Sequence, residues 1–273
     1  MKTKNILLGS ILIVAFCILY TGCKKDKKEK PSNYSAATDN AVADNAFAGI
    51  WKQVSTVTDS SGNLQATSGC PTVSTSGSSF PKTIVIDFGT SNCLGKDGNY
   101  RRGKITAVFS GKYLDSNTVI TTTLTNYFHN DYQIEGTQTI KNKGRIIKGH
   151  WVYNVVVNNG SVTSPDRSKI STWITNQNRE FYAGYKTSLY IFDDIYKISG
   201  TASGVAADGD AYSIVTNQDL QINVGCHWIV AGKLTLTLSK YPTYPIVVDY
   251  GAGACDPDAT VLLDGKTYNI KMQ

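Results

Sequence analysis

The sequence predicts an all-β protein, an antiparallel β-sandwich or β-roll with one short N-terminal helix. Glutamate, a strong helix former, occurs only at Glu29, Glu135 and Glu180, whereas Thr, Val, Ile, Tyr and Asn are abundant. Branched and aromatic side chains fit a pleated, half-buried surface, while Glu favours helix. From Gly69 onward, apolar and polar residues alternate with the period of two that is typical of strands.

A helical segment over residues 39–66 is expected before the strands. Apolar residues recur there at steps of three and four, which places them on one helix face; they are Ala43, Phe47, Ile50, Trp51, Val54 and Val57. Asp39 or Asn40 is expected to cap the start of this helix.

A single β domain is expected over residues 67–273, with the option of two related halves. Its predicted strands are 83–88, 104–109, 119–124, 149–157, 170–175, 189–198, 211–215, 228–238, 246–250 and 266–270. Dipeptides that tolerate the positive φ of tight turns separate these runs; they are Asp97-Gly98, Asn159-Gly160, Asp208-Gly209 and Asp264-Gly265. Mostly antiparallel connections follow.

Residues 1–22 have the pattern of a secretory signal. Lys2 and Lys4 precede an apolar stretch from Ile6 to Tyr20, which is shorter than the roughly 20 residues that a membrane span needs. The stretch ends in Leu19-Tyr20-Thr21-Gly22-Cys23, which resembles the bacterial lipobox, with Tyr20 where the usual pattern has Leu. The resemblance implies lipidation of Cys23 and a membrane anchor. A plain signal with an incidental cysteine is the alternative.

Residues 23–38 are too polar to bury and are expected to form a flexible tether. Of the 27 basic residues, 7 lie within residues 1–38, as do 2 of the 21 acidic ones. The remaining 20 basic and 19 acidic residues leave the body of the chain, residues 39–273, nearly neutral. This charge balance argues against nucleic acid as a partner, because nucleic-acid binding needs a clustered basic face. The basic tether suits anionic lipid head groups.

A weak internal repeat links two β segments. Residues 84–93 match residues 246–255, with Asp87 and Asp249, the glycines after them, and Cys93 and Cys255 displaced by one interval. Each segment also has an earlier cysteine, Cys70 or Cys226. Duplication and coincidence both remain open. The equivalent aspartates favour a shared structural role over catalysis, accepting backbone N–H groups before Gly89 and Gly251.

The four cysteines of the β domain are expected to form disulfides, because an exported chain meets an oxidising compartment. Three connectivities exist, and the sequence alone does not select one. The repeat favours Cys70 with Cys93 and Cys226 with Cys255. The alternative joins the halves, Cys70 with Cys226 and Cys93 with Cys255. Metal binding is the rival interpretation, but the chain lacks Cys-x-x-Cys and a histidine cluster of the zinc type.

These segments together resemble an uncharacterised lipoprotein family of Bacteroidota. The resemblance covers roughly the chain after Gly69, and its motifs are the lipobox, the paired Asp-Phe/Tyr-Gly-x3-Cys segments, Arg102-Gly103-Lys104-Ile105, Ile198-Ser199-Gly200-Thr201 and Cys226-His227-Trp228. His227 departs from the expected basic residue. The resemblance implies a β fold and an envelope location, and it brings no activity.

Few residues suggest chemistry. The three histidines, His129, His150 and His227, lack the spacing of a zinc protease, and no nucleophile elbow or phosphate-binding loop occurs. His150 precedes Trp151 in a predicted strand, so the two side chains should point to opposite faces. No cofactor, metal or catalytic residue is therefore assigned.

Aromatic residues give the strongest binding signal. Trp173, Tyr182, Tyr185 and Tyr190 fall within one stretch, which serves either as core or as a platform for sugar rings or a partner protein. We therefore expect an outer-membrane lipoprotein, facing the periplasm or the cell surface, that is a non-catalytic binding module for a glycan or envelope protein. An envelope hydrolase with an unrecognised site is the alternative.

The lipobox predicts that Cys23→Ala abolishes metabolic labelling with palmitate and moves the protein out of the membrane fraction. Wild-type protein labelled in parallel is the control. Undiminished labelling of the variant would disprove the anchor assignment.

Overall fold

The computed structural model describes residues 30–31, 33–58, 70–95, 97–184, 193–226 and 228–272. The predicted signal (1–22), Cys23, Tyr185, Tyr190 and His227 lie outside the described residues. The tether is described only at its end, from Lys30 onward with Ser32 excepted.

In the residues that the structure describes, the fold is all-β with one helix, as predicted. The helix α1 (Ser35–Thr56) precedes 14 strands in the described chain. The strands are β1 (Thr72–Ser76), β2 (Lys82–Asp87), β3 (Cys93–Leu94), β4 (Tyr100–Phe109), β5 (Val119–His129), β6 (Tyr132–Ile147), β7 (His150–Thr163), β8 (Ile170–Ala183), β9 (Ile195–Val205), β10 (Ala211–Asn223), β11 (Ile229–Leu238), β12 (Ile246–Ala252), β13 (Asp258–Leu263) and β14 (Lys266–Lys271). No helix in the described part of the chain is long and apolar enough to cross a membrane.

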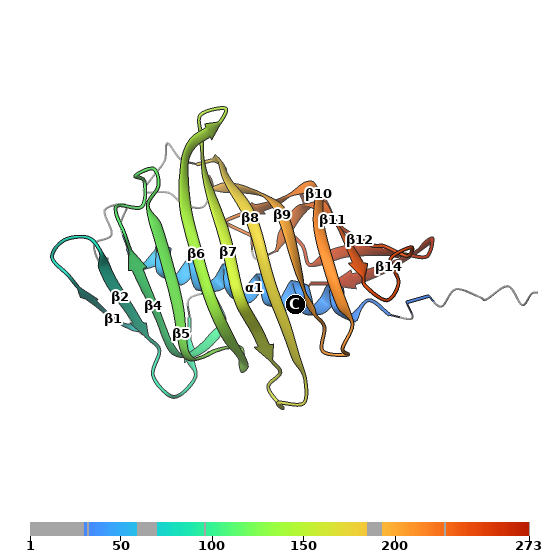
Figure 1. Ribbon diagram of the computed structural model, residues 1–273, viewed down its shortest axis with the longest axis horizontal. Helices are drawn as coiled ribbons and strands as arrows, with labels where there is room; N and C mark the ends of the chain where they lie inside the picture. Colours follow the sequence, from blue (N-terminus) through green and yellow to red (C-terminus); the bar gives the residue numbers. More distant parts are fainter. Residues whose placement is uncertain are drawn as a thin grey trace, which may run out of the picture.

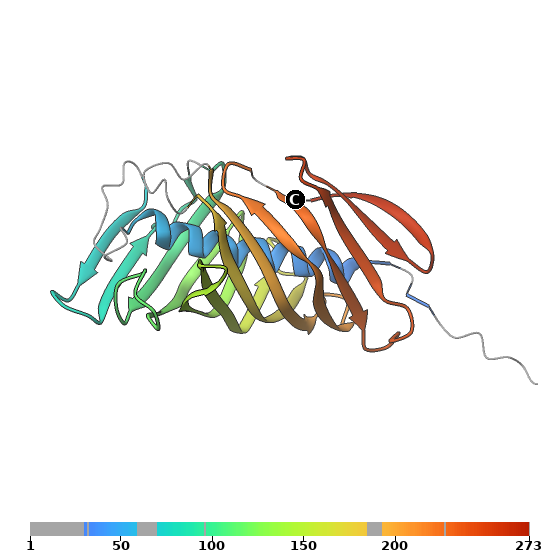
Figure 2. The same ribbon diagram turned by 90° about the horizontal axis from the view of Figure 1, so that it is seen from above.

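All strands belong to one antiparallel sheet in which neighbours in sequence are neighbours in space. The order runs from β1 to β14, and only the short β3 lies off this path, paired with β4. The sheet curls, so that α1 crosses behind the strands in Figure 1 and lies between the two margins of the sheet in Figure 2. Of the two expected arrangements, the roll describes this single curved sheet.

The inner face of the sheet encloses α1 on most sides. Phe47, Ile50 and Val54 are at most 1% exposed. Alanines take further buried positions of the helix, namely Ala36, Ala37, Ala43 and Ala46. The expected apolar helix face is thus confirmed, although the helix begins at Ser35 and ends at Thr56 instead of spanning 39–66.

Polar contacts fix the position of α1 along the sheet. The Trp173 Nε1–H donates to Asn40 Oδ1 at 2.8 Å, and the Ala207 N–H donates to Asp39 Oδ2 at 2.7 Å. The prediction that one of these two residues caps the helix is wrong, because both lie inside it and bind the sheet. The N-cap residue is Tyr34, whose side chain makes no capping hydrogen bond.

Four strands, β1, β3, β6 and β13, are absent from the sequence-based prediction. The longest of them, β6, places the polar Gln138 and Asn142 on the buried inner face. Apolar alternation is therefore interrupted, although the backbone pairs with β5 and β7 along most of its length. Burial of polar side chains against a helix overrides the usual pattern of a half-buried strand.

One predicted turn is also corrected. Asn159 and Gly160 lie inside β7, where the register shifts between Val157 and Gly160. A Cβ on Gly160 would stand 2.3 Å from the Trp173 carbonyl oxygen, so glycine permits the close approach of β8. The turn between β6 and β7 instead uses Lys148 and Gly149, both with positive φ.

The repeat corresponds to two hairpins, each closed by a disulfide. Cys70 pairs with Cys93 across the β1–β2 hairpin, and Cys226 pairs with Cys255 across the β11–β12 hairpin. The Cα–Cα distances are 6.2 and 5.8 Å, within the usual range for disulfides. The pairing favoured by the repeat is confirmed.

The equivalent aspartates have the expected structural role. Asp87 Oδ1 accepts the Gly89 N–H at 2.9 Å, and Asp249 Oδ1 accepts the Gly251 N–H at 2.9 Å. Each carboxylate also pairs with a lysine on a neighbouring strand, at 2.8 Å for Lys104 and 2.7 Å for Lys233. The Lys104 ammonium and the Gly89 N–H lower the pKa of Asp87, which keeps it ionised.

The outer face of the sheet carries a row of short side chains across twelve strands. In register order the row is Thr83, Val108, Thr121, Thr139, Val156, Asn176, Thr201, Val215, Thr235, Val247, Leu262 and Thr267. Branched side chains of this kind suit a pleated surface whose one face is exposed. Six of the twelve residues in this row are threonine.

The disulfides predict that reduction lowers the melting temperature of the folded protein. Each crosslink restricts the unfolded chain and contributes about 2–4 kcal/mol. Differential scanning calorimetry of wild-type protein and of the double variant Cys226→Ala, Cys255→Ala measures the effect of one crosslink. Peptide mapping without reductant checks the pairing, and a peptide that joins Cys70 to Cys255 would contradict it.

Candidate anion-binding pocket

Four strands place a row of polar and aromatic side chains on the outer face of the sheet. Arg102 of β4 lies opposite Phe128 of β5, Phe128 lies opposite Gln133 of β6, and Gln133 lies opposite Thr163 of β7. Side chains opposite each other in antiparallel strands have Cβ atoms roughly 5 Å apart. These residues therefore form a continuous strip near one end of the strands.

Backbone irregularities position this strip. The register of β4 and β5 shifts between Arg102 and Lys104, at Gly103. Gly103 has φ +86°, and a Cβ there would lie 2.0 Å from the Asn126 carbonyl oxygen, so only glycine fits. On the other side of Phe128, Asn130 and Asp131 both have positive φ and form the tight turn into β6.

The Arg102 side chain is held in place by three neighbours. Its guanidinium carbon lies 3.7 Å from the centre of the Phe128 ring, a cation–π arrangement. Its Nη1 donates to Asn92 Oδ1 at 2.7 Å and also to Asp131 Oδ1. Within the described residues both hydrogen bonds use Nη1, which leaves Nη2 available to a ligand.

A second arginine reaches the same place from the loop between β7 and β8. The loop is organised by Asp166, whose carboxylate accepts the hydroxyls of Ser164 at 2.6 Å and Ser168 at 2.7 Å. These hydrogen bonds lower the pKa of Asp166 to about 2. The next residue, Arg167, has φ +58°, and no carboxylate of the described chain pairs with its guanidinium.

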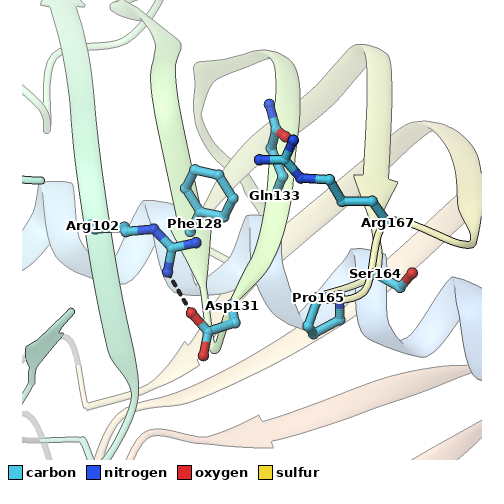
Figure 3. A pocket seen from close by; sticks show the side chains of 7 residues that line it. All are labelled: Arg102, Phe128, Asp131, Gln133, Ser164, Pro165 and Arg167. Atoms are coloured by element: carbon cyan, nitrogen blue, oxygen red, sulfur yellow. Dashed lines mark hydrogen bonds and ion pairs between the residues drawn. The ribbon is translucent and has the colours of Figure 1, made fainter. Parts of the chain in front are cut away.

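The two arginines flank a hollow of about 210 Å³. Figure 3 shows Arg102 against Phe128 on one side, and the Arg167 guanidinium beside the Gln133 amide on the other. The lining residues, which we call the arginine pocket, are Arg102, Phe128, Asp131, Gln133, Ser164, Pro165 and Arg167. A guanidinium recognises carboxylate, sulfate or phosphate through paired hydrogen bonds, so the pocket can hold an anionic group.

The neighbouring Arg101 turns to the opposite face and anchors β4. It is 1% exposed, and its Nη2 pairs with Asp97 Oδ2 at 2.6 Å. The Arg101 guanidinium, supported by Asn99, holds the pKa of Asp97 far below its usual range despite partial burial. Two consecutive arginines thus have different roles, one in the interior and one in the pocket.

The predicted aromatic site is only partly supported. Trp173 is 2% exposed and stacks on Phe47, with ring centres 5.4 Å apart, so its assignment to a binding surface is corrected to the core. Tyr182 is 42% exposed on the outer face. Lys197 Nζ lies 3.8 Å from the centre of the Tyr182 ring, and the His150 ring meets it edge-on. Tyr182 is therefore a surface residue whose ring is already in contact with a cation.

His150 points to the outer face, as predicted from the alternation with Trp151. Its Nδ1 lies 2.6 Å from Glu180 Oε1. Trp151 packs instead against the hydrophobic core. The His150–Glu180 pair borders Tyr182 and does not reach the arginine pocket, whose lining residues lie at the opposite end of β7 and β8.

A second hollow of about 510 Å³ lies on the outer face near the second disulfide hairpin. Its lining includes Gln218, Gln221, Lys233 and Asp249. The two charged residues neutralise each other across 2.7 Å. The arginine pocket differs because one of its cations has no acidic partner in the described chain.

None of the arginine-pocket residues stands out in the sequence. Arg102 and Arg167 are separated by 65 positions, and the motif that contains Arg102 brings no binding role. The Asn130-Asp131 pair is the one local signal, since Asn and Asp tolerate the positive φ of a tight turn.

Comparisons with protein-family models, curated proteins and solved structures find no significant match for this chain. Functional inference therefore rests on the residues and their geometry.

Proposed function

We propose that this protein is a lipid-anchored lipoprotein of the cell envelope, at the outer membrane, that binds acidic glycans through the arginine pocket. The observation that carries the proposal is the pair of guanidinium groups facing one hollow, one of them locked against Phe128 and the other without an acidic partner in the described chain.

The envelope location is supported by the N-terminal sequence and by the disulfides. A basic start, an apolar stretch and Cys23 in a lipobox form the export and lipidation signal. Two disulfides suit an oxidising compartment outside the cytoplasm. Lipid on Cys23 would retain the folded domain at the membrane.

The ligand class follows from the shape and chemistry of the pocket. Its volume is below the roughly 300–1,000 Å³ of clefts that enclose a drug-sized ligand, so it suits one charged sugar unit of a longer chain. Arg102 and Arg167 match a carboxylate or sulfate, while the Gln133 amide suits sugar hydroxyls. The pocket opens on the outer face of the sheet, where a polymer can lie across neighbouring strands.

We expect Arg167→Ala to weaken binding of a soluble polyuronate at least about tenfold, since a hydrogen bond to a charged group contributes about 1.5–3 kcal/mol. Isothermal titration calorimetry with the soluble polymer gives the affinity. The matched control is Lys169→Ala, which removes an exposed cation from the same loop but not from the pocket.

Equal losses for both variants would show that general charge, and not the pocket, attracts the polymer. Binding of neutral and acidic glycans alike would contradict the assigned ligand class. Cleavage of the polyuronate by the purified protein would favour the alternative function, an envelope hydrolase.

A further inference from the structure

The described chain begins against one end of the rolled sheet. Lys30 Nζ pairs with Asp264 Oδ2 at 2.7 Å and lies 5.4 Å from the centre of the Tyr244 ring. The Tyr34 ring lies 5.9 Å from that of Tyr268 on β14. These contacts fix the last residues of the tether beside the C-terminal hairpin.

Contacts of the first helical turns extend this attachment to the β9–β10 turn. The Ser35 hydroxyl donates to the Asp208 carboxylate, and Asp39 accepts the Ala207 N–H. In Figure 1 the blue start of the described chain lies beside β12 and β14, at the opposite end of the molecule from β1. The start of the described chain and the first turns of α1 are therefore held by three turns of the sheet, those after β9, β11 and β13.

We propose that this end of the molecule rests on the phospholipid head groups, with the turns after β9, β11 and β13 next to the bilayer and the β1–β5 end directed away from it. The proposal rests on the lipidation of Cys23 proposed above. Lys30 is the seventh residue after Cys23, and an extended chain spans at most about 3.6 Å per residue, so the reach is about 25 Å. Because the tether is so short, the end of the roll that contains Lys30 stays close to the membrane, even when the β1–β5 end also approaches it.

The chemistry of the β11–β12 turn suits the head-group layer. The turn contains Lys240, Tyr241 and Tyr244 between β11 and β12, and Lys240 Nζ lies 5.0 Å from the centre of the Tyr241 ring. Tyrosine and lysine have an apolar body and a polar tip, which places them favourably at a membrane surface. Asp208 and Asp264 belong to the same end, so the lipid anchor and not net charge sets the orientation.

The length of α1 separates the membrane-facing turns from the strand that carries Arg102. The helix contains 22 residues, which span about 33 Å at 1.5 Å per residue. The start of the helix lies against the membrane-facing turns. Gly49 belongs to its second half, and a Cβ at this position would lie 3.8 Å from the Arg101 side chain of β4. Arg102, next in sequence, is thus displayed away from the bilayer.

Site-specific fluorescence quenching tests the orientation. The lipidated full-length mature protein is reconstituted in vesicles of phosphatidylethanolamine and phosphatidylglycerol that include a head-group spin-labelled lipid. A fluorophore is attached at Thr243→Cys in the β11–β12 turn, or at the matched control Thr75→Cys in β1, both of them exposed. We expect several-fold stronger quenching at position 243 than at position 75.

Intact-mass measurement on the same samples verifies the acyl chains on Cys23, and non-reducing peptide mapping verifies both disulfides. Equal quenching at the two positions, or stronger quenching at position 75, with the acyl chains present would overturn the orientation. Missing acyl chains would refute the proposed lipoprotein itself.

A second measurement needs no variants. Acylation of wild-type protein in the same vesicles with a water-soluble reagent should modify Lys112, in the β4–β5 loop, several-fold more than Lys240, and the reverse ratio would contradict the proposal.

Discussion

The enclosure of α1 by the curved sheet is the constraint on which the rest of the structure depends. A meander of this length has two faces, and burial of the inner face needs an element that runs across most of the strands. The helix meets that need with fully buried Phe47, Ile50 and Val54, each of which contributes about 1.5–3 kcal/mol by leaving water. Alanines at the remaining inward positions let the strands approach closely from several directions.

The enclosed helix also explains the polar interior of the sheet. Gln138 Nε2 donates to the Phe47 carbonyl at 3.1 Å, and Trp173 donates to Asn40 at 2.8 Å. Buried polar groups are stable only where such partners exist, so these strands need the helix in one position. Removing the helix would leave the Gln138 amide and the Trp173 Nε1–H without these hydrogen-bond partners.

Curvature in turn shapes the outer face where the arginine pocket lies. Gly103 allows a register shift beside Arg102, and Gly136 and Gly160 approach each other across β6 and β7. Such irregularities increase the local twist of a sheet. They bring the Arg102 row and the β7–β8 loop around one hollow, although the loop lies far from β4 in the sequence.

The sequence predicts the fold better than the pocket, for physical reasons. Burial is reported directly by the alternation at Lys104–Phe109 and by the apolar spacing of Phe47, Ile50 and Val54. The repeat favours the disulfide pairs that the structure contains. The strand β6 escapes prediction because its inward Gln138 and Asn142 are stabilised by distant partners. Trp173 looks like a binding residue for the same reason, since only the structure shows that Asn40 and Phe47 cover it.

Native-state hydrogen exchange of the α1 amides tests the central role of the helix most directly. If α1 is an integral part of the core, the amides of Phe47 and Ile50 will exchange only through global unfolding, with the same free energy as the amides of β7 and β8. Exchange of the helix amides orders of magnitude faster than exchange of those strands would show that α1 leaves the sheet while the sheet stays folded, and would contradict this account.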